Sequence, residues 1–179
     1  MLGVIAGVLQ RKAKHSMTDS VINDLSERLG KLLLEHNLKL VTAESCTGGG
    51  LAEIITRIPG SSNWFERGFV TYSNEAKQEM LSVPFNTIDQ FGAVSEETAI
   101  TMAEGALDNS HADVSVSITG IAGPDGDTEG KPVGTVCFAW ARRDMETHSA
   151  TTIFIGNRMQ VRQQACMMAL QGLIDMIEV

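Results

Sequence analysis

A nucleophile for acyl transfer could come from residues 44–50 (ESCTGGG), where a serine, a cysteine and a threonine stand beside three glycines. Ser45 lies where a predicted strand passes into a predicted helix, the usual ligand position in open α/β sheets. Free N–H groups at a helix start stabilise an oxyanion or hold a phosphate. A purely structural interpretation is that Ser45 or Thr47 caps the helix. The run is neither a G-x-S-x-G elbow, because Ala43 replaces the first glycine, nor a P-loop, because no lysine follows.

A serine nucleophile needs a base. The four histidines show neither a convincing acidic partner nor metal-ligand spacing; they are His15, His36, His111 and His148. Lys77 is an alternative base, since the positive end of its predicted helix and burial would both disfavour the ammonium form. Tyr72, the single tyrosine, could relay a proton or orient Lys77, although both residues equally fit an exposed surface. Cys46 is a second candidate nucleophile, because thiolates form readily near helix N-termini.

Two further segments could complete a pocket around Ser45. Residues 119–126 (TGIAGPDG) leave a predicted strand at its carboxyl end and could contribute backbone N–H groups. Arg158, at the start of the last predicted helix, could bind a phosphate through two hydrogen bonds. A glycine-rich loop is often only a turn, and a single arginine at this position is often a surface residue.

Hydrophobic periodicity predicts the elements that position these residues. Helices are expected at residues 19–36, 48–58, 74–83, 95–109 and 157–177. Strands are expected at residues 38–43, 67–73, 112–119, 133–142 and 147–155. Strands alternate with helices up to residue 119, and a hairpin and a helix follow. This order predicts one three-layer α/β/α domain with a mixed sheet, in which parallel strands come first and an antiparallel edge follows.

Composition narrows the possible functions of this chain of 179 residues. It is 43% hydrophobic and 20% charged, which excludes the disordered class. A net charge of −8 argues against nucleic acid as a partner. No apolar run reaches the roughly 20 residues that span a membrane. Three widely spaced cysteines predict reduced thiols in a cytoplasmic protein, namely Cys46, Cys137 and Cys166.

The N-terminal residues 1–16 form an apolar stretch followed by basic residues. A secretory signal has the opposite order, with its positive charges before the apolar stretch. We therefore expect an extension outside the core, and a domain at residues 17–179. A short helix packed on a partner is the alternative interpretation.

Five motifs, in this order, resemble the CinA C-terminal domain family. They are TAESCTGG at 42–49, PGSSNWFERGFVTYSNEAK at 59–77, GAVSEET at 92–98, SITGIAGPDG at 117–126 and KPVGTV at 131–136. The resemblance runs from about Met17 to the C-terminus and needs no large gap. Asn157 stands where similar sequences often have aspartate, and Gly50 where a larger residue is common; neither change affects Ser45 or Lys77.

The resemblance implies hydrolysis of the carboxamide of nicotinamide mononucleotide (NMN) to nicotinate mononucleotide and ammonia, within NAD recycling. It implies a Ser45–Lys77 dyad that works through an acyl-enzyme, with Tyr72 in support and with no cofactor or metal. It implies substrate contacts from Thr47, Gly48, Gly49, Thr119, Gly120, Gly123 and Arg158. A homodimer or larger homo-oligomer is expected. The alternative is a non-catalytic nucleotide-binding module, or a regulatory module linked to competence or DNA damage; an amidase for another small amide is a further alternative.

Overall fold

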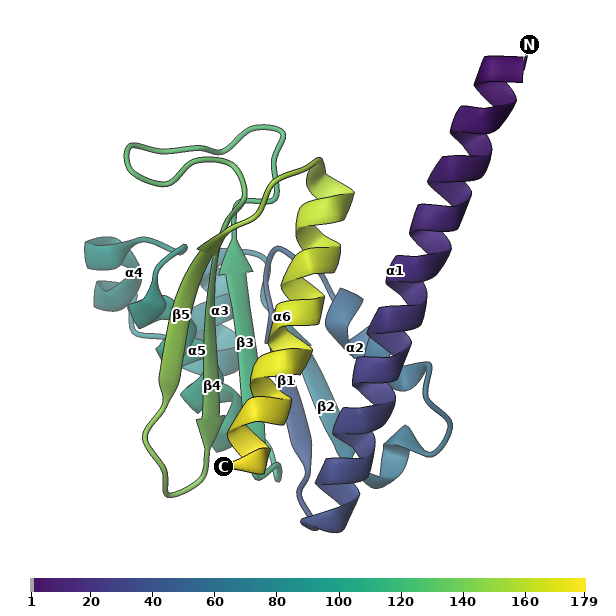
Figure 1. Cartoon of the computed structure of the whole chain (residues 1–179). Coiled ribbons are helices and arrows are strands. Elements are labelled where there is room, and N and C mark those ends of the chain that lie inside the picture. Colours follow the sequence, from purple (N-terminus) through teal and green to yellow (C-terminus); the bar gives the residue numbers. More distant parts are fainter. Residues whose placement is uncertain (1) are drawn as a thin grey trace.

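The computed structural model describes the backbone of residues 2–179 and the side chains of residues 19–179. Its centre is a five-stranded sheet in the order β2-β1-β3-β4-β5 (Figure 1). The strands are β1 (Leu40–Glu44), β2 (Phe65–Val70), β3 (Val114–Gly120), β4 (Thr135–Arg142) and β5 (His148–Ile153). β2 and β3 pair with β1 in parallel, whereas β4 and β5 are added antiparallel. The predicted mixed sheet, with its antiparallel edge, is confirmed.

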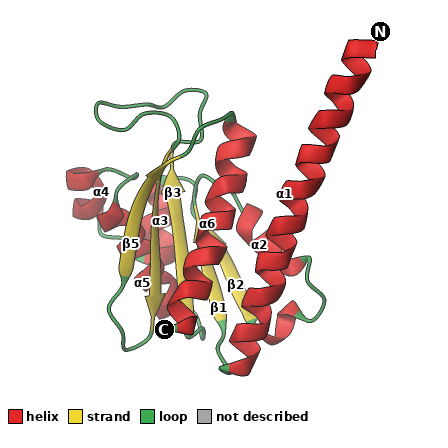
Figure 2. Cartoon of the chain, viewed as in Figure 1, coloured by secondary structure: helices red, strands yellow, loops and turns green. Residues whose placement is uncertain are grey.

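Helices cover both faces of this sheet (Figure 2). They are α1 (Leu2–Glu35), α2 (Gly50–Thr56), α3 (Asn74–Leu81), α4 (Phe85–Phe91), α5 (Glu96–Asp108) and α6 (Arg158–Glu178), with a 3-10 turn, η1 (Ser61–Asn63). One core cluster joins α1, α2 and α6 to one sheet face, and a second joins α3, α4 and α5 to the other. The chain therefore has the predicted three-layer α/β/α architecture. None of the helices described is long and apolar enough to cross a membrane.

The alternation of side chains along β3 explains its unusual sequence, VSVSITG. Its branched residues enter the core under α6, while Ser115 and Ser117 face α5. Both serine hydroxyls are buried and donate to backbone carbonyls of α5, at 2.7 and 2.6 Å. Because a buried hydroxyl is costly unless it is hydrogen-bonded, these bonds make two polar positions compatible with a central strand.

Two helices differ from the expectation. α1 begins at Leu2 rather than at residue 19, so Asp19 and Ser20 lie inside the helix instead of capping it. No proline interrupts residues 2–18, so the helical backbone continues through them. The side chains of the predicted extension, residues 1–16, lie outside the described residues, and the boundary at 17 stays a prediction. The unpredicted α4 has only seven residues and starts after Pro84, without a side-chain cap to reveal it.

Gly105 sets the close approach of α5 to the end of α3. A Cβ at this position would lie 1.9 Å from the carbonyl oxygen of Leu81. We expect Gly105→Ala to lower the melting temperature, because overpacking costs about 1–3 kcal/mol and exceeds the roughly 1 kcal/mol that alanine gains in a helix. Asp108→Ala, on the exposed side of the same helix, is the control and should change the melting temperature little. A Gly105→Ala variant that melts at or above the parent temperature would contradict this packing.

Candidate active site

Ser45 is the first residue after β1, at the carboxyl end of the parallel strands. Its N–H donates to the carbonyl of Ile118 at 2.9 Å, which extends the pairing of β1 with β3 by one residue. The sheet therefore fixes the backbone of Ser45, and only 8% of the residue is exposed. This is the edge at which open α/β sheets bind their ligands.

The structure brings Lys77 to Ser45 from the first turn of α3. Lys77 is 1% exposed, and its Nζ donates to Ser45 Oγ at 3.1 Å and to the carbonyl of Thr71 at 3.0 Å. Ser73 Oγ accepts from the N–H of Ala76 and so caps the helix that carries the lysine. The predicted strand 67–73 ends at Val70, and its last three residues instead form the loop that leads into α3.

Burial gives Lys77 the properties of a base. Removal from water lowers the pKa of its ammonium group, while the nearby Cys46 and Glu75 oppose that shift. In its neutral form, the amine keeps one N–H directed at Thr71 and accepts the proton of Ser45 with its lone pair. The pair can therefore activate a serine oxygen without a histidine.

The turn after Ser45 carries N–H groups that are available to a ligand. Gly48 N–H donates to the Ser45 carbonyl at 3.0 Å, and Gly50 N–H donates to the Thr47 carbonyl at 3.1 Å. Gly48 and Gly49 have φ values of +59° and +89°, which a residue with a side chain rarely adopts. In the described part of the chain, the N–H groups of Cys46, Thr47 and Gly49 donate to no backbone carbonyl. They are the candidate donors to an oxyanion.

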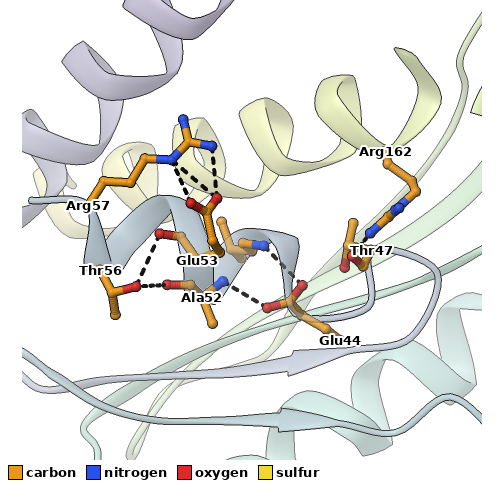
Figure 3. Close-up of polar contacts among 8 residues, drawn as sticks. Glu44, Thr47, Ala52, Glu53, Thr56, Arg57 and Arg162 are labelled. Carbon is orange, nitrogen blue, oxygen red and sulfur yellow. Dashed lines mark hydrogen bonds and ion pairs between the residues drawn. The ribbon is translucent and has the colours of Figure 1, made fainter. Parts of the chain in front are cut away.

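Glu44 caps α2 through its side chain, a role that was not predicted from the sequence. Its buried carboxylate accepts from the N–H groups of Leu51 and Ala52 at 3.0 and 2.9 Å (Figure 3). The helix N-cap is Gly49, which has no side chain, so the predicted capping by Ser45 or Thr47 is wrong. Glu44 thus occupies the N–H groups of Leu51 and Ala52, and the candidate donors to a substrate are the N–H groups of residues 46, 47 and 49 in the preceding turn.

Tyr72, Arg158 and Gly123 form a second cluster, on three separate segments. Arg158 donates through Nη2 to the Tyr72 hydroxyl and through Nη1 to the Gly123 carbonyl, both at 2.9 Å. Tyr72 is 61% exposed. Its hydroxyl bonds to Arg158, and among the described contacts it has none with Lys77 or Ser45. The role of Tyr72 in proton transfer stays a prediction.

Thr119 and Gly120 are held by contacts within the protein. The hydroxyl of Thr119 is buried and donates to the Ala93 carbonyl at 2.6 Å. A Cβ at Gly120 would lie 2.8 Å from the carbonyl oxygen of Thr135 on the neighbouring strand. These contacts explain why a threonine and a glycine end β3, and their predicted role in substrate binding is untested.

Arg162 is a further residue of the site and was not among those predicted from the sequence. It lies one helical turn after Arg158 on α6, and its Nη2 donates to the Thr47 carbonyl at 2.5 Å (Figure 3). The i, i+4 spacing of the two arginines was a readable signal, because such residues share one helix face. Nothing in the sequence alone indicated that this face points at residues 45–50.

Attack by a thiolate, the alternative chemistry at this turn, finds little support in the site. Burial raises the pKa of the Cys46 thiol to about 12, so Cys46 is protonated and a poor nucleophile at neutral pH. Among the residues with described side chains, no three of histidine, cysteine, aspartate and glutamate gather in a group that could hold a metal ion.

Fold and site together define an α/β domain with a buried serine–lysine pair at the carboxyl edge of its parallel strands. The chain belongs to the CinA C-terminal domain family, whose family model matches residues 22–177. This match includes both members of the pair and the arginines of α6.

Relatives and solved structures agree with this assignment. "Nicotinamide-nucleotide amidohydrolase PncC" of Escherichia coli (strain K12) is 55% identical over 157 residues, which are 88% of this chain and 95% of that protein. The protein of the same name from Pseudomonas putida is 48% identical over 155 residues, 87% of this chain and 96% of its own length. The crystal structure of "competence/damage inducible protein CihA" from Agrobacterium tumefaciens has a TM-score of 0.86 and 41% identity, covering 89% of this chain and 96% of its own.

Proposed function

We propose that this chain hydrolyses the carboxamide of NMN to nicotinate mononucleotide and ammonia. The contact between Lys77 Nζ and Ser45 Oγ, 3.1 Å long and buried, carries the proposal. Burial lowers the pKa of Lys77, and Ser45 is the residue that directly follows β1. The names of the two relatives above indicate the nucleotide amide as the substrate.

The first half of the proposed reaction acylates Ser45. Neutral Lys77 accepts the Ser45 proton, and Oγ forms a bond to the amide carbon of NMN. The N–H groups of residues 46, 47 and 49 stabilise the oxyanion, an effect of roughly 3–4 kcal/mol per donor in other enzymes. Lys77 then gives its proton to the leaving nitrogen. The carbon–nitrogen bond breaks and ammonia departs, leaving the nicotinoyl ester on Ser45.

The second half reverses the path of the proton. Lys77 is again neutral and accepts a proton from water, whose oxygen attacks the ester carbon. The tetrahedral intermediate collapses, the bond to Oγ breaks, and Lys77 returns the proton to Ser45. Every proton passes through the amine of Lys77. The Thr71 carbonyl, which also accepts from Nζ, keeps that amine in place.

The substrate phosphate is proposed to bind at Arg158. We expect Arg158→Ala to raise KM for NMN about tenfold or more, because a hydrogen bond to a charged group contributes roughly 1.5–3 kcal/mol. KM for nicotinamide riboside, which lacks the phosphate, should change little. Steady-state kinetics with both compounds measure the difference, with Arg57→Ala on the exposed end of α2 as control. An equal loss for both compounds would show that Arg158 acts only by holding Tyr72 and Gly123.

Ammonia release from NMN by the purified chain, with EDTA present, tests the function directly. One nicotinate mononucleotide should form for each ammonia, at an undiminished rate in EDTA. If NMN binds without ammonia release, the chain is a nucleotide-binding module rather than an enzyme. If NMN neither binds nor reacts, the substrate or the entire activity is different.

The proposed setting is the cytoplasm, because the three cysteines are unpaired and buried. The expected homo-oligomer is supported by large apolar side chains that are exposed in the single chain. Among them are Ile155 at 89%, Phe85 at 63% and Ile153 at 57%. An assembly that covers them would remove their contact with water.

A further inference from the structure

Arg162 lies against the turn that follows Ser45, although the reaction above assigns it no task. It reaches this turn from α6, 115 residues away in sequence from Thr47. A Cβ at Gly48 would lie 3.5 Å from its guanidinium. Its Nε is buried and has no hydrogen-bond partner among the described residues. A buried donor without a partner is costly, so a structural role alone accounts poorly for an arginine here.

The hydrogen bond of Arg162 restrains the segment that needs restraint most. Residues 48 and 49 are glycines with left-handed φ values, and glycine has the greatest backbone freedom of all residues. In the described part of the chain, Arg162 supplies the one hydrogen bond from a side chain outside the turn to the backbone of residues 45–49. The N–H of Gly50 donates to the same Thr47 carbonyl. The guanidinium therefore holds the second of two overlapping turns, which span residues 45–48 and 47–50.

The charge of Arg162 also opposes that of Glu44. The Glu44 carboxylate is 1% exposed, caps α2 and forms no ion pair among the described side chains. Both charges act on Cys46, next to Ser45: Arg162 lowers the pKa of that thiol and Glu44 raises it. An oxyanion at this turn would be repelled by Glu44 and attracted by Arg162, in a setting that water screens little.

We propose that Arg162 is a positioning residue for the turn that follows the nucleophile. Arg162 holds the Thr47 carbonyl and compensates the charge of Glu44, so that the N–H groups of the turn can receive an oxyanion. This inference rests on the proposed amidohydrolase function. Arg162 acts through the backbone of residues 46–49, so its effect should fall on the chemical step rather than on substrate binding.

The test compares Arg162→Ala and Arg162→Lys with the parent chain, and Arg57→Ala is the matched control. Arg162→Ala should lower kcat for NMN at least about tenfold with little change in KM, since loss of one oxyanion donor elsewhere costs roughly 10²–10³. Labelling of Ser45 by a fluorophosphonate, followed by intact mass, should slow in parallel. Arg162→Lys should retain an intermediate rate, and added guanidinium ion at a non-denaturing concentration should restore part of the alanine variant's rate.

Three results for the Arg162 variants would overturn the inference. A kcat and a labelling rate within about twofold of the parent would show that the turn is positioned without Arg162. A higher KM with unchanged kcat would make Arg162 a substrate contact instead. A loss of rate together with a lower melting temperature, and without rescue by guanidinium, would leave only a structural role. If the parent releases no ammonia but labels at Ser45, the proposed function fails and the labelling rates alone decide on Arg162. A parent chain that neither releases ammonia nor labels at Ser45 overturns both the proposed function and the role of Arg162.

Discussion

Ser45→Ala is expected to abolish ammonia release from NMN, by on the order of 10⁴-fold or more, because loss of a serine nucleophile removes nearly all the catalysis of its group. NMN binding should persist, since the proposed phosphate contact comes from Arg158. The fold should also persist, because the sheet holds residue 45 through its backbone N–H rather than its hydroxyl. Ammonia assays, with calorimetric binding of NMN, measure both effects.

The exposed Ser20→Ala substitution on α1 is the matched control for the loss of a hydroxyl, and it should retain the parent rate. A rapid quench of the parent, analysed by intact mass, should reveal the nicotinoyl ester on Ser45 if its hydrolysis is slow. Full activity in the Ser45→Ala variant would mean that another group attacks the amide. In that event the short contact with Lys77 would have no part in the reaction.

Lys77→Met is expected to reduce the rate by roughly 10²–10⁴-fold, which is the usual contribution of a general base. In the parent, the rate should rise with pH as Lys77 loses its proton, with a midpoint below that of an ordinary lysine because burial lowers its pKa. The methionine variant should lose this rise. Initial rates between about pH 6 and 10 test both expectations, with the exposed Lys39→Met as control.

The same lowered pKa of Lys77 makes stability depend on pH. The unfolded chain binds a proton at this lysine up to a pKa of about 10.4, whereas the folded chain loses it at a lower pH. Between those two values the unfolded state holds more protons, so the free energy of unfolding rises with pH. A methionine at position 77 removes this pH-dependent contribution to the free energy of unfolding. Lys77→Met should therefore gain stability relative to the parent at low pH, and the gain should shrink as the pH rises through that window.

Thermal melts across that pH range give the comparison directly. A constant difference between the parent and Lys77→Met would mean that Lys77 has the same pKa folded and unfolded. Its assignment as a neutral base would then be wrong, whatever the effect on the rate.

The sequence by itself determined the layered fold, because strand and helix periodicities are local. The alternation along residues 114–120 and the apolar periodicity of α6 each require one buried face, and short connections leave few ways to stack those faces. The carboxyl ends of β1 and β3 had to meet at one edge, so Ser45 was already placed near the glycine-rich loop after residue 119. Lys77, Tyr72 and Arg158 were candidates from their residue types and positions, and the family resemblance favoured these roles over exposed surface positions.

Only the tertiary structure decided which groups contact one another at that edge. Glu44 follows the strand predicted at residues 38–43, whereas the structure makes it the last residue of β1. Its role as the cap of α2 depends on a turn that folds the helix start back onto it. The sequence did not indicate that the Thr71 carbonyl or Arg162 would contact the site. A backbone acceptor carries no side-chain identity, and Arg162 follows Thr47 by 115 residues. Burial, which turns Lys77 from an ordinary cation into a base, likewise arises from packing among distant segments and not from its neighbours in the chain.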